Sequence, residues 1–253
     1  MAILEGKSVT KNFGGLTAVD HVDFHLESGE IVGLIGPNGA GKTTLINVIA
    51  GTFPASGGEV RFEGQPILGK KPHEIARLGI SRTYQIVKPF RNLTVLDNVM
   101  VGALFGAHGL ARDMKTARAH AEEVLEFVGL ADQRDQHADE LNVPGMKRLE
   151  VAKALAMDPN VLLLDEVMAG LNTTEVDEAV VLIKQIRDSG VTILVIEHVM
   201  RAITGVSDRV FVLHHGQKIA DGAPQAVMSD DRVIKAYLGS RYGSDQGGSA
   251  DAA

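Results

Sequence analysis

The stretch that decides the fold is Ile31-Val-Gly-Leu-Ile-Gly-Pro-Asn-Gly-Ala-Gly-Lys-Thr-Thr-Leu45. Its first five residues form a short apolar run that predicts a buried strand, and a glycine-rich loop follows. Lys42-Thr43-Thr44 then begins a predicted helix that ends at Gly51. This order of strand, loop and helix is the context in which the pattern G-x-x-x-x-G-K-[ST] binds phosphate groups.

The loop residues predict how a nucleoside triphosphate is held. Glycines let successive main-chain N–H groups converge on an anion, and the start of a helix adds partial positive charge. We expect Lys42 to act catalytically on the β- and γ-phosphates and Thr43 to offer its hydroxyl to Mg²⁺. A glycine-rich turn without a ligand is the weaker alternative, because all three elements occur in the required order. The expected nucleotide contacts are Gly36, Pro37, Asn38, Gly39, Ala40, Gly41, Lys42, Thr43 and Thr44.

Length and composition limit the remaining possibilities. A chain of 253 residues can bury one full-sized core and a small subdomain. The absence of cysteine excludes disulfides and thiolate metal sites. The N-terminus lacks the pattern of a secretion signal, and no run approaches the ~18 apolar residues of a membrane helix. A net charge of −7 argues against a general nucleic-acid partner, although a local basic patch stays open. We therefore expect a soluble protein of the cytosolic side.

The pattern of strands and helices predicts a discontinuous α/β core. Strand patterns occur in residues 1–88 and again in 159–242, whereas 89–158 shows helical periodicity only. We therefore expect a helical subdomain inserted into an α/β nucleotide-binding core that has a β-rich opening. Residues 243–253 are rich in Gly, Ser, Asp and Ala and are expected to be disordered.

Two carboxylates follow the apolar run Val161-Leu-Leu-Leu-Asp-Glu166. A phosphate loop needs a carboxylate on the neighbouring strand to hold Mg²⁺ through water, and Asp165 fits this role. Glu166 is expected to face the γ-phosphate and to polarise the attacking water. The alternative is a solvated acidic turn, which is common after a strand but less expected beside a phosphate loop.

Two further polar residues end predicted strands, and a third candidate precedes the sheet. Gln85 and His198 are expected at the edge where open α/β sheets bind ligands. Gln85 would touch Mg²⁺ or the water, and His198 would hydrogen-bond the γ-phosphate, although a lone strand-end histidine is more often structural. Phe13 would stack on an adenine ring or fill the core, and the sequence leaves both readings open.

The order of these features resembles the ATP-binding cassette ATPases. The resemblance extends to about Tyr242 and includes the phosphate loop, Gln85, Leu141 with Arg148-Leu-Glu-Val-Ala-Lys-Ala-Leu155, the Asp-Glu pair and Glu197-His198. Four stretches are similar to the branched-chain amino-acid importer ATPases. They are Phe13-Gly-Gly-Leu-Thr-Ala-Val-Asp20, Asn92-Leu-Thr-Val-Leu-Asp-Asn-Val99, Glu166-Val-Met-Ala-Gly-Leu-Asn172 and Val233-Ile-Lys-Ala-Tyr-Leu-Gly239.

The resemblance implies a P-loop, RecA-like core with an antiparallel β subdomain. It implies that Phe13 stacks on adenine, that Gln85 is the lever to the membrane permease subunits, and that 169–172 lies at a dimer interface. Two cassettes would enclose two ATP molecules with Mg²⁺, at the cytoplasmic face of the inner membrane. The cargo implied is branched-chain or other amino acids, delivered by an external solute-binding protein. The alternative is a soluble, non-transport ATPase that acts in translation or DNA maintenance.

The chain departs from the family at its signature, Leu-Ser-Gly-Gly-Gln, which aligns with Leu141-Asn-Val-Pro-Gly145. Asn142 can cap the helix that follows and donate to a γ-phosphate, so Asn142 and Gly145 remain expected nucleotide contacts. Pro144 brings no N–H, however, and Val143 obstructs close approach of the backbone. We therefore expect the ATP site completed by this segment to be weakened or silent. This favours a dimer of two different cassettes, while a homodimer stays open.

Overall fold

The computed structural model describes residues 2–84, 89–107 and 113–238. The predicted lever Gln85 and the predicted disordered tail, 243–253, lie outside these residues. The strand and the helix predicted from the opening stretch are both confirmed, as β3 (Ile31–Ile35) and α1 (Lys42–Ile49).

The core is a six-stranded sheet in the order β10-β9-β3-β8-β7-β6. All its neighbouring strands are parallel except β9 and β10, which form a hairpin. Every residue of β3, β7 and β8 is buried, as expected of strands covered on both faces. Besides β3, the sheet contains β6 (Ile80–Arg82), β7 (Val161–Asp165), β8 (Thr192–Ile196), β9 (Arg209–His214) and β10 (Gln217–Gly222).

One expectation about this sheet is wrong. Asp165 was expected on the strand next to the phosphate-loop strand, but β8 lies between β3 and β7. Strand order depends on how distant segments pack, and the apolar runs of β7 and β8 are too alike to reveal it. The consequence is that Glu197 and His198, which follow β8, lie between the loop and the Asp-Glu pair.

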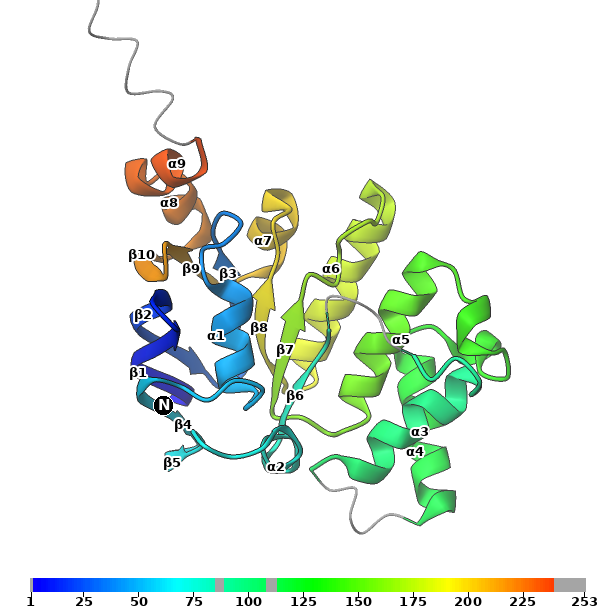
Figure 1. Ribbon diagram of the computed structural model, residues 1–253. Helices are drawn as coiled ribbons and strands as arrows, with labels where there is room; N and C mark the ends of the chain where they lie inside the picture. Colours follow the sequence, from blue (N-terminus) through cyan, green and yellow to red (C-terminus); the bar gives the residue numbers. More distant parts are fainter. Residues whose placement is uncertain (1, 85–88, 108–112, 239–253) are drawn as a thin grey trace, which may run out of the picture.

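A second, antiparallel sheet has the order β2-β1-β4-β5 and lies beside α1 (Figure 1). Its apolar residues and α1 share one buried cluster with one face of the large sheet. In β2, buried Val22, Phe24 and Leu26 alternate with exposed residues, as predicted. The strands are β1 (Ala2–Phe13), β2 (Leu16–Glu27), β4 (Gly57–Phe62) and β5 (Gln65–Pro66).

The opposite face of the large sheet packs against helices. The capping box predicted at Asn172 and Glu175 is present and begins α6 (Thr173–Asp188). The shorter helices α7 (Met200–Val206) and α8 (Pro224–Met228) were not predicted, because so few residues show little periodicity. The other helices of the core are α2 (Pro72–Leu78) and α9 (Asp231–Leu238).

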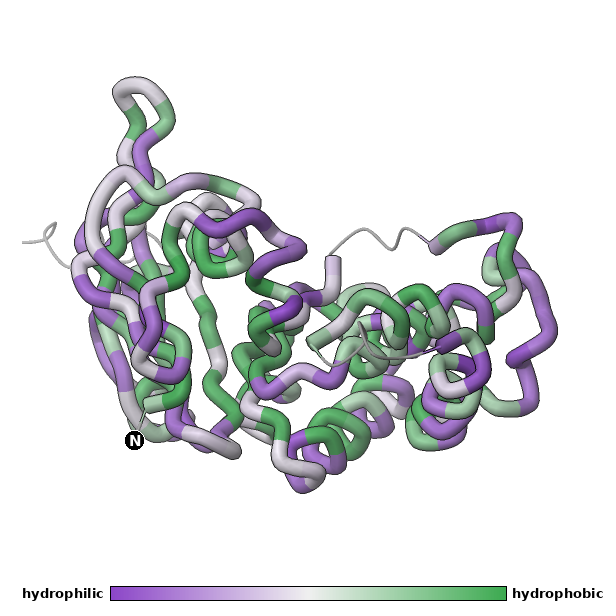
Figure 2. The backbone as a smooth tube through the Cα atoms, turned by 90° about the horizontal axis from the view of Figure 1, so that it is seen from below, coloured by the Kyte–Doolittle hydropathy of each residue, from purple (hydrophilic) through white to green (hydrophobic). Residues whose placement is uncertain are grey.

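The helices of residues 89–158 pack around a cluster of their own. Figure 2 shows this block to one side of the two sheets, with hydrophilic and hydrophobic segments alternating along its helices. β6 and β7, which precede and follow the block, are neighbours in the same sheet. Within the block the described residues form no strand, only one isolated bridge between Thr94 and His137. The block contains α3 (Val95–Phe105), α4 (Met114–Phe127), η2 (Ala131–Gln133), η3 (Ala138–Glu140) and α5 (Val143–Leu155).

The described part of the chain contains no helix that is both long and apolar enough to span a membrane.

Candidate nucleotide site

A pocket of about 560 Å³ opens at the carboxyl end of β3, over the phosphate loop. The loop forms its floor, the end of β1 and the start of β2 form one wall, and Glu166 contributes from the far side. This is the edge at which parallel sheets bind ligands. The lining residues are Phe13, Leu16, Ala18, Asn38, Gly39, Ala40, Gly41, Lys42, Thr43, Thr44 and Glu166.

Close contacts with the neighbouring main chain require glycine at two positions of the loop. Gly41, the N-cap of α1, has φ 102°, and a Cβ on it would lie 2.3 Å from the carbonyl oxygen of Ala18. At Gly36 a Cβ would lie 2.1 Å from the carbonyl oxygen of Leu213. No larger residue fits at either position without movement of the main chain, so the loop packs against both sheets. The first N–H groups of α1, which have no partners inside the helix, face the same region.

Lys42 folds back over the loop. Its Nζ donates to the carbonyl oxygens of Gly36 at 2.7 Å and Pro37 at 3.0 Å. Burial lowers the pKa of the Lys42 ammonium, while the charges of Glu166 and Asp165 raise it. The ammonium therefore lies between the loop and the acidic pair, where it can contact phosphate oxygens.

Asp165 is a buried carboxylate with one unpartnered oxygen. It is only 1% exposed, and its Oδ1 has no hydrogen-bond partner among the described residues. Burial raises the pKa of Asp165, and the Arg82 guanidinium, 3.4 Å from Oδ2, lowers it. The hydroxyl of Thr83 accepts the main-chain N–H of Asp165 at 3.1 Å and so fixes the end of β7. An unpartnered buried carboxylate oxygen fits a hard cation such as Mg²⁺.

Glu166 and His198 face each other at the carboxyl ends of β7 and β8. The Nδ1 of His198 lies 3.6 Å from the Oε1 of Glu166. The Glu166 side chain is 17% exposed and lines the loop pocket, whereas the His198 side chain is 53% exposed. Glu166 has φ 51°, a left-handed conformation that is rare for a residue with a side chain. A carboxylate that borders both the pocket and an imidazole can accept a proton from water there.

Two charged residues near this pair received no role from the sequence. Glu197 is fully buried, and its Oε1 accepts the main-chain N–H of Met168 at 2.7 Å. Burial raises its pKa to about 7. Lys147, on α5, donates to the main-chain oxygen of Glu166 at 3.1 Å. The sequence marked Glu197 through its place after an apolar strand and beside His198, and it did not mark Lys147.

The other predicted contacts lie at the rim of the pocket or beyond it. Phe13 ends β1, is 42% exposed and packs edge-to-face on Phe53, 5.3 Å away. The Lys11 ammonium lies over the same ring, 4.7 Å from its centroid, and the partly exposed ring is not a core residue. Asn142 caps α5 by accepting the N–H of Gly145 at 2.9 Å. Neither Asn142 nor Gly145 lines the loop pocket of the same chain.

Two family models match the chain. The first, described as ABC transporter, matches residues 19–169, which is more than half of its length. The chain belongs to the ABC transporter family. A second model, described as branched-chain amino acid ATP-binding cassette transporter, matches residues 217–243 of the cassette. ABC transporter cassettes are ATPases, and so is this one.

Similar proteins cover nearly the whole cassette. It is 38% identical to the high-affinity branched-chain amino acid transport ATP-binding protein BraF of Pseudomonas aeruginosa, over 94% of this chain and 98% of that protein. It is also 38% identical to the corresponding protein LivG of Escherichia coli, with the same coverage of both chains.

Solved structures agree with the fold. A nucleotide-free ATP-binding cassette of an ABC transporter is 32% identical, with a TM-score of 0.87 over 94% of this chain and 100% of that one. A cassette described in its ADP conformation is 33% identical, with a TM-score of 0.86 over 94% of this chain and 99% of that one. The predicted α/β P-loop fold is thus confirmed.

Proposed function

We propose that this cassette hydrolyses Mg²⁺-ATP and thereby drives an importer of branched-chain or other amino acids. The observation that carries the hydrolytic part is the placement of Glu166 at the phosphate-loop pocket and beside His198. The transport part is supported by the match of residues 217–243 and by the relatives described as branched-chain amino acid transport proteins.

In this proposal each residue has a distinct role. Main-chain N–H groups of Gly36–Thr44 hold the phosphates, and Lys42 exchanges its carbonyl contacts for phosphate oxygens. Thr43 and Asp165 would hold Mg²⁺, which neutralises phosphate charge when bound. Glu166 accepts a proton from the attacking water, and His198 holds the γ-phosphate.

Phe13 and Gln85 complete the proposed site. The exposed ring of Phe13 at the pocket rim is suited to stack on adenine. Gln85 is proposed to contact Mg²⁺ or the water and to act as the lever between the site and the helical block. It follows Tyr84, which already lines a different groove.

That groove, of about 490 Å³, lies between the end of β6 and helices α3 and α5. Exposed aromatic rings of Tyr84, Phe90 and Phe105 line it together with charged Glu150 and Lys153. We propose that a cytoplasmic loop of a membrane permease binds here, which would place the cassette at the inner face of the cell membrane. An external solute-binding protein would choose the cargo.

The altered segment 141–145 supports a dimer of two different cassettes. Asn142 caps α5 through the N–H of Gly145, so this N–H is already used within the chain. Pro144 offers no N–H, and the exposed side chain of Val143 would obstruct the close approach of a phosphate to this segment. In a mixed dimer, Glu-to-Gln changes placed on each cassette in turn should reduce turnover unequally. Equal losses would contradict the proposal that one site is weak.

Copurification tests the transport proposal against the alternative. A tagged cassette should bring down membrane permease subunits from detergent extracts, and substitution of Tyr84 and Phe90 by Ala should weaken this capture. Recovery with ribosomes or DNA instead would favour a non-transport ATPase of translation or DNA maintenance, which none of the comparisons supports.

A further inference from the structure

Lys147 connects two parts of the cassette that are distant in sequence. It lies in the second turn of α5, two residues after Gly145. Its Nζ donates to the main-chain oxygen of Glu166 at 3.1 Å, across 19 residues of chain. A helix of the helical block is thus bonded directly to the main chain of the proposed catalytic carboxylate.

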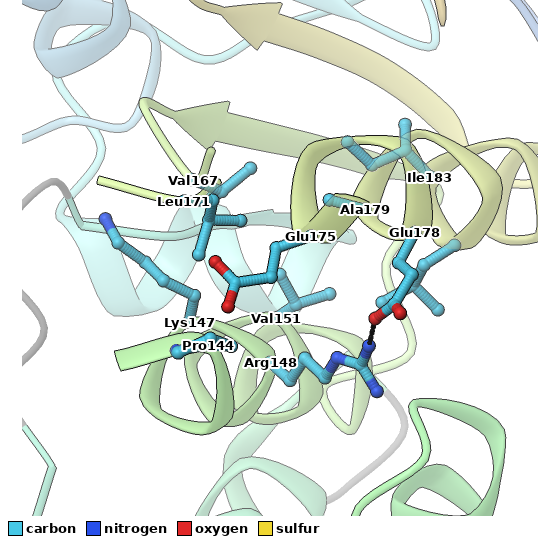
Figure 3. A pocket seen from close by; sticks show the side chains of 11 residues that line it. Pro144, Lys147, Arg148, Val151, Val167, Leu171, Glu175, Glu178, Ala179 and Ile183 are labelled. Carbon is cyan, nitrogen blue, oxygen red and sulfur yellow. Dashed lines mark hydrogen bonds and ion pairs between the residues drawn. The ribbon is translucent and has the colours of Figure 1, made fainter. Parts of the chain in front are cut away.

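The stem of Lys147 is fixed by packing. It lines a small cavity, of about 30 Å³, between α5 and α6, together with apolar Val151, Val167 and Leu171. Figure 3 shows the ammonium pointing away from the ion pair of Arg148 with Glu178. A lysine whose methylene groups lie on apolar side chains can direct its ammonium to one polar partner. Here the packing directs it to Glu166.

The main chain of Glu166 needs such support. Its left-handed φ of 51° costs about 1 kcal/mol or more for a residue with a side chain, so the surroundings must hold it. The N–H of Glu166 donates to the carbonyl oxygen of Ile196 on β8 at 3.0 Å. Lys147 holds the carbonyl of the same residue. The same carbonyl oxygen also accepts the N–H of Ala169 at 3.3 Å, so Lys147 adds the side-chain bond, from α5, to a main chain that is already held on both sides of Glu166.

The positive charge of Lys147 is also favourable at this position, because carboxyl groups lie nearby. Burial raises the pKa of Asp165 and of Glu197, and the Lys147 ammonium opposes that rise at both. The ammonium therefore attracts the carboxyl groups of Asp165 and Glu197, while it bonds the main chain of Glu166. A neutral side chain of the same length would keep the packing and lose this attraction.

We propose that Lys147 is a positioning residue for Glu166, holding its main chain in the left-handed conformation and tying it to α5. This rests on the proposed function, in which Glu166 is the base and 141–145 completes the ATP site of a second cassette. Segment 141–145 leads into α5. A displacement of this segment would therefore reach Glu166 through the Lys147 side chain.

The first test is amide hydrogen exchange on the purified, nucleotide-free chain. Lys147→Met keeps the apolar stem and removes the donor, so the Glu166 amide should exchange about tenfold faster than in the wild type, as local opening becomes easier. Lys147→Arg should restore most of the protection. Arg148→Met is the matched control, because it removes a charge from the same helix but not this bond, and should leave Glu166 unchanged.

The second test is steady-state ATP hydrolysis by the same variants, each assembled in a dimer with the wild-type second cassette. In Lys147→Met we expect kcat to fall about tenfold while KM for Mg²⁺-ATP stays within about twofold, because the phosphate loop is untouched. Lys147→Arg should recover most of kcat. Unchanged exchange at Glu166, or faster exchange with an unchanged kcat, would overturn the positioning role. Faster exchange at Glu166, combined with no hydrolysis by the wild-type dimer of the two cassettes, would instead contradict the proposed function and leave the main-chain contact established.

Discussion

Replacing Glu197 by Gln should make the cassette more stable at alkaline pH. Glu197 is fully buried at the end of β8, and its Oε2 has no hydrogen-bond partner among the described residues. Burial raises its pKa from the ordinary 4.5 to about 7. The amide of Gln has the shape of the protonated acid, can still accept the Met168 N–H and never acquires a charge. The substitution therefore removes the cost of a buried anion.

The sign and the size of the change in stability with pH follow from the pKa values of Glu197 in the folded and the unfolded chain. In the unfolded chain Glu197 loses its proton near pH 4.5, whereas in the folded chain it keeps the proton until about pH 7. The wild type therefore loses stability as the pH rises between these values, and no further change comes from this group above them. One unit of pKa corresponds to about 1.4 kcal/mol, so the total is about 3 kcal/mol.

The assay is urea unfolding of the wild type and Glu197→Gln between pH 4 and pH 8.5. The stability of the variant relative to the wild type should rise by about 3 kcal/mol across this range. Glu74→Gln is a control of opposite sign, because a main-chain N–H of Lys71 lowers the pKa of Glu74 and its charge stabilises the fold above that pKa. A difference between Glu197→Gln and the wild type that does not vary with pH would refute the reasoning.

Substitutions at three other residues test the proposed site and the cap of α5. Glu166→Gln should lower ATP turnover at least about 100-fold while ATP binding, measured by equilibrium titration, persists; undiminished turnover would remove Glu166 as the base. Gly41→Ala should lower ATP affinity at least about tenfold in the same titration, because its Cβ would meet the Ala18 carbonyl, whereas equal affinity would show that the loop adapts. Asn142→Ala should lower the free energy of unfolding by about 1 kcal/mol and Asn142→Ser should not, since only Ala removes the bond to the Gly145 N–H.

The sequence predicted those features whose cause is local. The strand, loop and helix of Ile31–Ile49 form because neighbouring residues determine each of them, and the capping box at Asn172 is a pattern four residues long. Asp165 and Glu166 were found for the same reason, since they end an apolar run.

What the sequence did not predict depends on distant contacts. The bonds of Lys147 to Glu166 and of Glu197 to Met168 join residues 19 and 29 positions apart. No local pattern marks such pairs, because they exist only once α5, β7 and β8 have packed together. The position of β8 between β3 and β7 escaped prediction for the same reason. Sequence reasoning therefore located the proposed catalytic residues but not those that hold them in place.

Two glutamates lie at the carboxyl ends of the neighbouring strands β7 and β8, and their surroundings differ. Glu197 cannot reach water, because it is fully buried and its Oε1 is engaged by the Met168 N–H. Glu166 lines the loop pocket, remains partly exposed and lies beside His198. A pKa near 7 also means that Glu197 is partly protonated at neutral pH, which reduces its repulsion of the Glu166 carboxylate. The buried acid thus bonds the segment after β7, and these surroundings support Glu166 as the proposed base.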